Sequence, residues 1–139
     1  ILKRKKIKKK IRLELLKPTK IYSKEILKLA EKKIIHAGAH ITGGGLVENL
    51  IRSIPNNLSI NIDLNKIKIS NIFKWIKKHN IPEKEMITTF NCGIGFCIIT
   101  KKEYISRIQK IFSKKFRPYQ IGYVSKNKKK INISGSLQW

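Results

Sequence analysis

The sequence predicts an α+β domain in which helices pack on a mixed sheet of short strands. The chain has 139 residues, which is the size of one domain. Hydrophobic residues make up 41% of it, enough for an ordinary core despite the charge. Apolar residues recur with both helical and alternating spacing, and the segments lack the regular strand–helix alternation of a parallel sheet. These three observations favour helices packed on one mixed sheet.

The first elements follow from charge and spacing. Residues 1–12 form a basic run that we expect to be a solvated lead-in or linker, which leaves 13–139 for the folded domain. Ser23 is placed to cap a helix over about 24–34, whose apolar residues recur at helical spacing. An extended segment over 36–40 then enters a glycine-rich turn.

The middle of the chain alternates between the two spacings. Helical periodicity predicts a helix over 46–54, and Pro55 lies beyond its end. Alternating apolar residues predict a strand over 58–64. A helix over 72–80 follows, and Pro82 begins another short helix.

The last third contains the remaining strands. Large apolar residues alternate with small ones over 90–98, which predicts a strand with one bulky face and one nearly bare face. A helix is predicted over 102–114. Two closing strands, over 120–125 and 131–133, flank the lysine-rich turn 126–130.

The net charge of +24 is typical of nucleic-acid binding, but the composition has another explanation. Ile, Lys and Asn supply 64 of the 139 residues, and all three have A/T-rich codons. Only 5 of the 32 basic residues are Arg, which nucleic-acid sites favour for its planar fork. We therefore interpret the charge mainly as drift in an A/T-rich genome, and expect no nucleic-acid partner.

Lysine is absent from two windows, residues 34–65 and 85–100, although 27 lysines occur in the chain. The same two windows hold six of the eight glycines. Burial of the side chains, a strict backbone geometry or a role in binding or catalysis would each exclude lysine from these positions. We call these segments the lysine-free windows, and they contain every candidate functional residue.

The sequence also excludes some classes. No apolar run approaches the roughly 20 residues of a membrane helix, and the basic start lacks the apolar stretch of a signal peptide. We expect reduced thiols at Cys92 and Cys97, which point to opposite faces if they share a strand. Together these features predict a cytoplasmic protein with no membrane partner. The missing initial Met is consistent with a fragment or with a longer reading frame.

The first candidate site is the run Thr42-Gly43-Gly44-Gly45. Consecutive glycines allow a sharp turn whose N–H groups point at an anion, and Thr42 adds a hydroxyl donor. A plain tight turn is the alternative, since the run lacks the spacing of a phosphate-binding P-loop. His40 adjoins the loop and is the better candidate of the two nearby histidines for holding a substrate or moving a proton. His36 and His40 lack a third metal ligand nearby, so we expect no metal site.

The second candidate site is the segment Asn91-Cys92-Gly93-Ile94-Gly95. Asn91 offers both a donor and an acceptor, and Gly93 leaves room for a ligand or another backbone. A nucleophilic Cys92 is the alternative, but its predicted face is apolar.

Four segments together resemble the C-terminal domain of phosphoribosylformylglycinamidine cyclo-ligase, also called aminoimidazole ribonucleotide synthetase. They are LLKPTKIY (15–22), HAGAHITGGGLVENL (36–50), FKWI (73–76) and EMITTFNCGIG (85–95). The resemblance covers about residues 13–125. Formylglycinamidine synthetase, selenophosphate synthetase and thiamine-phosphate kinase share the fold, but the pair HITGGGL and TFNCGIG points to the cyclo-ligase.

The resemblance implies a reaction of purine biosynthesis. ATP phosphorylates the formamide oxygen of formylglycinamidine ribonucleotide, an internal nitrogen attacks that carbon, and phosphate leaves as the imidazole ring closes. ATP and Mg²⁺ would bind mainly on an N-terminal domain, which also forms a homodimer. The residues expected on the substrate side are His40 as the catalytic residue and, for binding, Thr42, Gly43, Gly44, Gly45, Asn91 and Gly93.

The chain departs from the family in lacking that N-terminal domain and its Asp- and Gly-rich nucleotide segments. We therefore expect residues 1–139 alone to be inactive, either as a fragment or as the partner of a separate N-terminal half. Two other functions stay open at this point. One is a basic nucleic-acid-binding module, and the other is a catalytically dead remnant.

Overall fold

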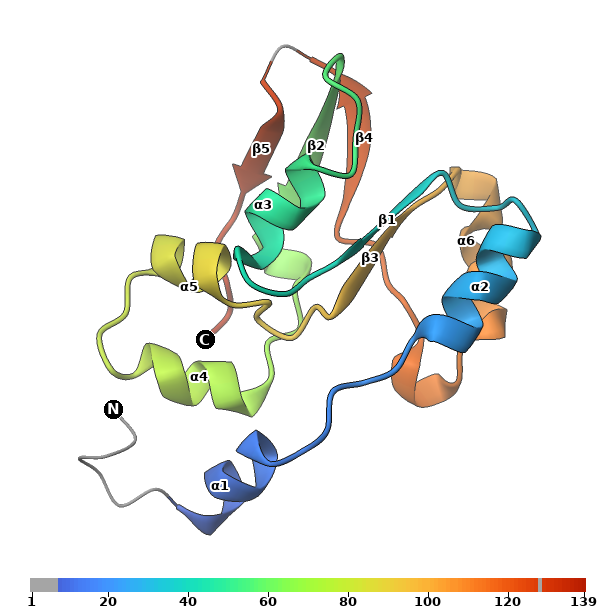
Figure 1. The fold of residues 1–139 in the computed structure, drawn as a ribbon. Coiled ribbons are helices and arrows are strands. Elements are labelled where there is room, and N and C mark those ends of the chain that lie inside the picture. The colour runs from blue at the N-terminus through green and yellow to red at the C-terminus, as the bar shows by residue number, and fades with distance from the viewer. Residues whose placement is uncertain (1–7, 128) are drawn as a thin grey trace.

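The computed structural model describes residues 8–127 and 129–139, and it confirms the α+β class (Figure 1). The helices in this part are α1 Lys9–Leu15, α2 Ser23–Glu31, α3 Gly45–Ile51, α4 Asn71–Lys77, α5 Glu83–Thr89 and α6 Ile105–Ile111. Three short 3₁₀ turns are η1 Leu64–Lys66, η2 Lys102–Tyr104 and η3 Lys114–Phe116. The strands are β1 Ala37–His40, β2 Leu58–Asp63, β3 Phe96–Ile99, β4 Gly122–Lys126 and β5 Ile131–Ser134.

The strands form two sheets rather than the single sheet that the pattern favoured. β1 pairs antiparallel with β3, from Ala37 opposite Ile99 to His40 opposite Phe96. The second sheet has the order β4-β2-β5, in which β2 is antiparallel to β4 and parallel to β5. The two closing strands are therefore confirmed, but they flank β2 and do not pair with each other.

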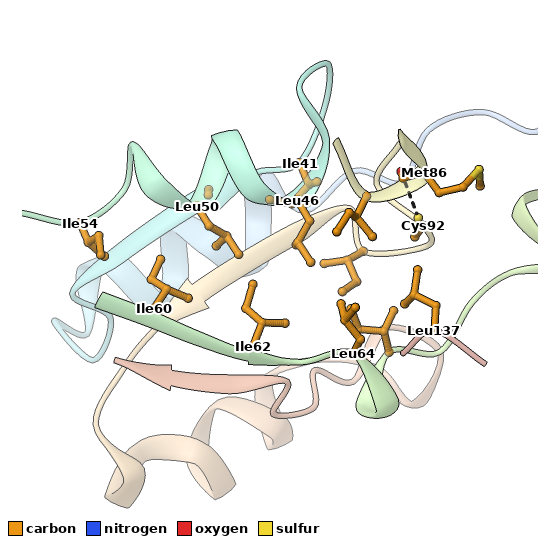
Figure 2. Packing of buried hydrophobic residues seen from close by; sticks show 14 residues of the cluster. Ile41, Leu46, Leu50, Ile54, Ile60, Ile62, Leu64, Met86, Cys92 and Leu137 are labelled. Carbon is orange, nitrogen blue, oxygen red and sulfur yellow. Dashed lines mark hydrogen bonds between the residues drawn. The ribbon is translucent and has the colours of Figure 1, made fainter. Parts of the chain in front are cut away.

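The main core lies between the three-stranded sheet, α3, α5 and the inner face of the β1–β3 ribbon (Figure 2). Ile60 and Ile62 of β2 point at Leu46 and Leu50 of α3, as alternating and helical spacing require. Of the 14 buried residues of this cluster, 12 lie in the lysine-free windows. Burial therefore accounts for most of the absence of lysine there, because an unpaired charge in an apolar core is costly.

A second, smaller cluster covers the other face of the ribbon. Leu29 of α2, Ile34, and Ile108 and Phe112 at α6 are buried together, and Ile98 of β3 packs against them. Figure 1 shows α2 and α6 beside each other at the far end of the ribbon from α4 and α5. The ribbon thus separates two cores.

The helix predicted over 24–34 is shorter than expected. It runs from Ser23 to Glu31, and Ser23 is its first residue, with no side-chain hydrogen bond at the cap. Lys33 has φ of 52°, a left-handed conformation that ends the helix. Ile34 is nevertheless buried, at 2% exposure, because the chain folds back onto α2.

The strand predicted over 90–98 is wrong for its first half. Cys92 has φ of 49° and Gly93 has φ of 104°, which no strand accommodates. Residues 90–95 therefore form a turn, and only Phe96–Ile99 is a strand. Large and small residues do alternate here, but Gly93 is small because the tight turn needs its positive φ, not because it lies on a strand face.

The basic lead-in predicted over 1–12 lies partly outside the described residues, since 1–7 are not among them. Residues from Lys9 to Leu15 form α1, none of whose side chains is buried. None of the helices in the described ranges is long and apolar enough to cross a bilayer.

The packing makes a prediction for stability. Ile62→Ala should lower the free energy of unfolding by about 2–5 kcal/mol, because Ile62 is 2% exposed and its removal leaves a cavity. Ile133→Ala on β5 is the matched control, since that side chain is 39% exposed. Urea denaturation followed by circular dichroism measures both variants. Equal losses would contradict the placement of Ile62 in the core.

Candidate functional site

The two lysine-free windows meet at one end of the β1–β3 ribbon. His40, the last residue of β1, lies opposite Phe96, the first residue of β3. The backbone N–H of Ile41 then donates to the carbonyl of Gly95 at 3.0 Å. The glycine loop that follows β1 and the turn that precedes β3 are therefore neighbours, as antiparallel pairing requires.

The three glycines of the first loop have different environments. Gly44 has φ of 85°, and the side chain of Glu48 occupies the space where a Cβ would lie. Gly45 has φ of 61° and packs on the backbone of α5, where a Cβ would lie 2.7 Å from the carbonyl carbon of Thr88. A Cβ on Gly43 would meet no atom within 4 Å. Gly44 and Gly45 thus have structural reasons to be glycine, whereas the space at Gly43 is open.

Asn49 holds the glycine loop in shape, which the sequence did not reveal. Its Nδ2 donates to the carbonyls of Gly43 at 3.1 Å and Gly45 at 2.6 Å. Arg52 donates in turn to Oδ1 of Asn49 at 2.9 Å. An amide one helical turn after a glycine run is the signal that would have identified it, because such a side chain reaches back to the loop carbonyls.

The second loop is a tight turn closed by Asn91. Its Oδ1 accepts a hydrogen bond from the N–H of Gly93 at 3.0 Å, which is an Asx turn. A Cβ on Gly93 would lie 3.0 Å from the carbonyl of Lys68, so the loop packs closely on the segment before α4. Within the described residues, the Nδ2 of Asn91 has no hydrogen-bond partner, and this donor stays available.

His40 belongs to a row of aromatic rings. It stacks on Phe96 with ring centroids 6.2 Å apart and 24° between the planes, and Phe96 contacts Tyr22 at 6.0 Å. Gly38 makes room for the Phe96 ring, and Gly95 makes room for the Tyr22 ring. The exposed imidazole of His40 is therefore oriented by the ring beneath it. Burial raises the pKa of the Tyr22 hydroxyl.

The histidines do not form a metal site with each other. His40 ends β1 and His36 directly precedes that strand, so the two residues are about 13 Å apart at the rise of a strand. No cluster of three His, Cys, Asp or Glu residues that could hold a metal ion is found among residues 8–127 and 129–139.

Both cysteines are free and unsuited to nucleophilic chemistry. Cys92 is buried, and its thiol donates to the carbonyl of Met86 at 3.4 Å (Figure 2). Burial, and secondarily the negative charge of Glu83, raises the pKa of Cys92 to about 11. Burial raises the pKa of Cys97 to about 12. The reactive form is the thiolate, which both environments disfavour.

The predicted site residues therefore lie at one end of the ribbon, but they differ in their exposure to solvent. His40, Thr42, Gly43 and Gly93 are exposed, and Asn91 is half-buried. Gly45 is buried under α5, so it shapes the loop from below. The exposed groups are an imidazole, a hydroxyl, an amide donor and loop backbone, which can bind a polar ligand through hydrogen bonds.

The fold and this site define an α+β domain in which two glycine-bearing loops meet beside a β-ribbon. The family model for the AIR synthase related protein, C-terminal domain, matches residues 2–133. The chain belongs to this family, which confirms the resemblance seen in its motifs.

Curated relatives agree with this assignment. Phosphoribosylformylglycinamidine cyclo-ligase of Prochlorococcus marinus is 42% identical over 127 residues, which cover 87% of this chain and 37% of the relative. The cyclo-ligase of Enterococcus faecalis is 42% identical over 104 residues, which cover 74% of this chain and 30% of the relative. The trifunctional purine biosynthetic protein adenosine-3 of Gallus gallus is 43% identical over 111 residues, which cover 79% of this chain and 11% of the relative. The chain thus spans little more than a third of these relatives at most.

The glycine environments predict unequal effects of alanine. Gly45→Ala should lower the free energy of unfolding by about 2 kcal/mol or more, because it combines a left-handed backbone with a Cβ against Thr88. Gly43→Ala should change it by less than about 0.5 kcal/mol, because its space is open. Urea denaturation measures both. If the two variants lose stability equally, the loop is not packed on α5 as described.

The thiols predict a pH dependence of alkylation. With a pKa of about 11, Cys92 is thiolate in only about one molecule per thousand at pH 8, so iodoacetamide should react about tenfold faster per pH unit up to pH 11. The raised pKa also means that this group stabilises the fold below pH 9 and that its contribution is lost as the pH rises through 11. Mass spectrometry measures the alkylation, with urea-unfolded protein as the control. Rapid alkylation of the folded chain at pH 8 would contradict the burial.

Proposed function

We propose that this chain is the C-terminal domain of an ATP-dependent cyclo-ligase that converts formylglycinamidine ribonucleotide to aminoimidazole ribonucleotide. In this reaction the γ-phosphoryl group of ATP is transferred to the formamide oxygen, and ADP is released as the first product. An internal nitrogen then attacks the activated carbon, and phosphate departs as the ring closes. The observation that carries the proposal is the family match over residues 2–133, together with relatives named for this activity.

The proposed role of the domain is to supply the substrate side of the cleft. Thr42, Gly43 and Gly93 would offer exposed hydrogen-bonding groups around the substrate, and the free Nδ2 of Asn91 would add a donor. His40, held flat on Phe96, would be the group that moves a proton. Gly44 and Gly45 would act on the substrate through the shape of the loop, which Asn49 holds.

ATP and Mg²⁺ are assigned to an N-terminal ATP-binding domain or subunit. The described residues contain no carboxylate cluster that fits Mg²⁺, so the proposed role of this domain does not include holding the metal. On this proposal the chain has no activity alone, and it acts in the cytoplasm as part of a homodimer of the complete enzyme.

The two alternative functions explain less of the molecule. A nucleic-acid-binding module is suggested by the charge of +24, but the loops that carry the family similarity contain no lysine. A dead remnant would have no reason to keep, at the same end of the ribbon, open space at Gly43 and an Asn91 amide donor that is unpaired among the described residues.

The proposal predicts activity by complementation. The chain is mixed with the segment of the Enterococcus faecalis cyclo-ligase that precedes the matched region, and ATP, Mg²⁺ and formylglycinamidine ribonucleotide are added. We expect imidazole product and ADP from the mixture and none from the chain alone. A mixture that forms a complex without product would contradict the proposal, and tight salt-dependent binding to duplex DNA would favour the nucleic-acid module.

Two variants locate the activity within the mixture. Gly43→Val should lower kcat/KM about tenfold or more, a loss of about 1.4 kcal/mol, while the melting temperature stays unchanged because Gly43 is exposed and an added Cβ meets no atom within 4 Å. Lys110→Ala on α6 is the control, since that side chain is exposed and α6 lies at the other end of the ribbon from α5 (Figure 1). Full activity of Gly43→Val would remove the loop from the site.

A further inference from the structure

Residues 135–139, which we call the strap, follow β5 and lie beside α4 and α5 (Figure 1). Leu137, in the middle of the strap, is only 4% exposed. It belongs to the main core cluster together with Met86 of α5 and Cys92 (Figure 2). Burial of this apolar side chain anchors the strap on the core. The strap is therefore part of the folded domain.

Polar contacts hold the two residues that flank Leu137. Oδ1 of Asn65 accepts from the N–H of Ser136 and from Nε2 of Gln138, both at 3.3 Å. Nζ of Lys74 on α4 donates to the carbonyl of Gln138 at 3.0 Å. The strap is thus attached to η1 and α4 as well as to the core.

The strap is also attached to Glu83, the first residue of α5. Oε2 of Glu83 accepts from the N–H of Leu137 at 3.2 Å and from the indole Nε1 of Trp139 at 2.9 Å. Hydrogen bonds to a carboxylate are stronger than those between neutral groups. Pro82, at the cap of α5, supplies no side-chain hydrogen bond, so Glu83 is the side chain that ties the start of this helix to the strap.

Both loops of the candidate site contact α5. Gly45 of the glycine loop packs on the backbone of Thr88 near the end of this helix. The Asn91 turn follows α5 directly, and the thiol of Cys92 in this turn donates to the carbonyl of Met86. Because α5 has only seven residues, its tertiary contacts stabilise it more than its own helix propensity does. A shift of α5 would therefore change the spacing between the two loops.

We propose that Glu83 and Trp139 are positioning residues: the strap fixes the start of α5, and α5 sets the distance between the glycine loop and the Asn91 turn. The inference rests on the proposed function, because these are the two loops assigned to the substrate side. Both residues act through α5 and not on the substrate. The negative charge of Glu83 contributes to the raised pKa of Cys92, which agrees with a carboxylate close to the turn.

A pair of matched substitutions isolates the contact. Trp139→Phe removes the indole N–H that donates to Glu83 and keeps an aromatic ring, which Lys77 contacts at 5.9 Å from its centroid. Trp75→Phe on α4 is the control, because it makes the same change at a half-buried tryptophan whose ring contacts His79. These are the only two tryptophans of the chain.

Amide hydrogen exchange followed by NMR measures the effect on the loops of the chain 1–139. The N–H groups of Gly45 and Gly93 are hydrogen-bonded within their loops. We expect their exchange to be about threefold faster or more in Trp139→Phe, because α5 is less firmly held. The N–H of Tyr104, which donates to the carbonyl of Lys101 after the other end of β3, should exchange at an unchanged rate.

Activity measures the consequence for the proposed reaction. In the complementation mixture, Trp139→Phe should lower kcat/KM about threefold or more, and Trp75→Phe by less than twofold, at a temperature where both variants are folded. Glu83→Gln keeps an oxygen that can accept both hydrogen bonds, so it should retain most of the activity. Glu83→Ala removes the acceptor and should lose at least as much as Trp139→Phe. If Glu83→Ala does not fold, the other variants decide.

Three results would overturn the inference. They are unchanged exchange at Gly45 and Gly93 in Trp139→Phe, equal acceleration at Tyr104, which would indicate a general loss of stability, and equal kcat/KM in Trp139→Phe and Trp75→Phe. The proposed function can fail separately. If the mixture with the unmodified chain forms no imidazole product, the proposed function is wrong, and the exchange rates still decide whether the strap positions the two loops.

Discussion

The pairing of β1 with β3 is the interaction on which the rest of the structure depends. It joins residues 37–40 to residues 96–99, more than 50 positions apart, and it divides the apolar side chains between two cores. The pairing also brings the glycine loop and the Asn91 turn together, because a strand that ends beside the start of its antiparallel partner places the flanking loops side by side. Without this ribbon, neither loop would have a neighbour and α2 would have no surface to cover.

Close packing against neighbouring backbone and side chains is the second constraint, and it accounts for most of the glycines in the lysine-free windows. Gly45 lies on the backbone of α5, Gly93 lies on Lys68, and Gly95 lies under Tyr22. At each position a Cβ would enter space that is already occupied. The glycine content of the lysine-free windows therefore reflects packing first, and Gly43, which has open space around it, is the position where a functional requirement can be separated from a structural one.

The division into two sheets leaves unpaired strand edges among the described residues. A ribbon of two strands is marginally stable in water unless other elements cover it. Here α2 and α6 cover one face of the ribbon and the main core covers the other, and among the described residues the outer strands of both sheets each pair on one side only.

The sequence by itself determined the α+β class, the order and approximate limits of most elements, the family and the loops that carry its motifs. These features depend on local spacing and on residue identity, which are readable without coordinates: Leu58–Asp63 alternates as a strand does, and Pro82 precedes α5. Only the tertiary structure decided that residues 90–95 turn, that Asn49 clamps the glycine loop, and that β2 lies between β4 and β5. Each of these results depends on which distant backbone a residue meets, and alternation or helical spacing contains no information about that partner.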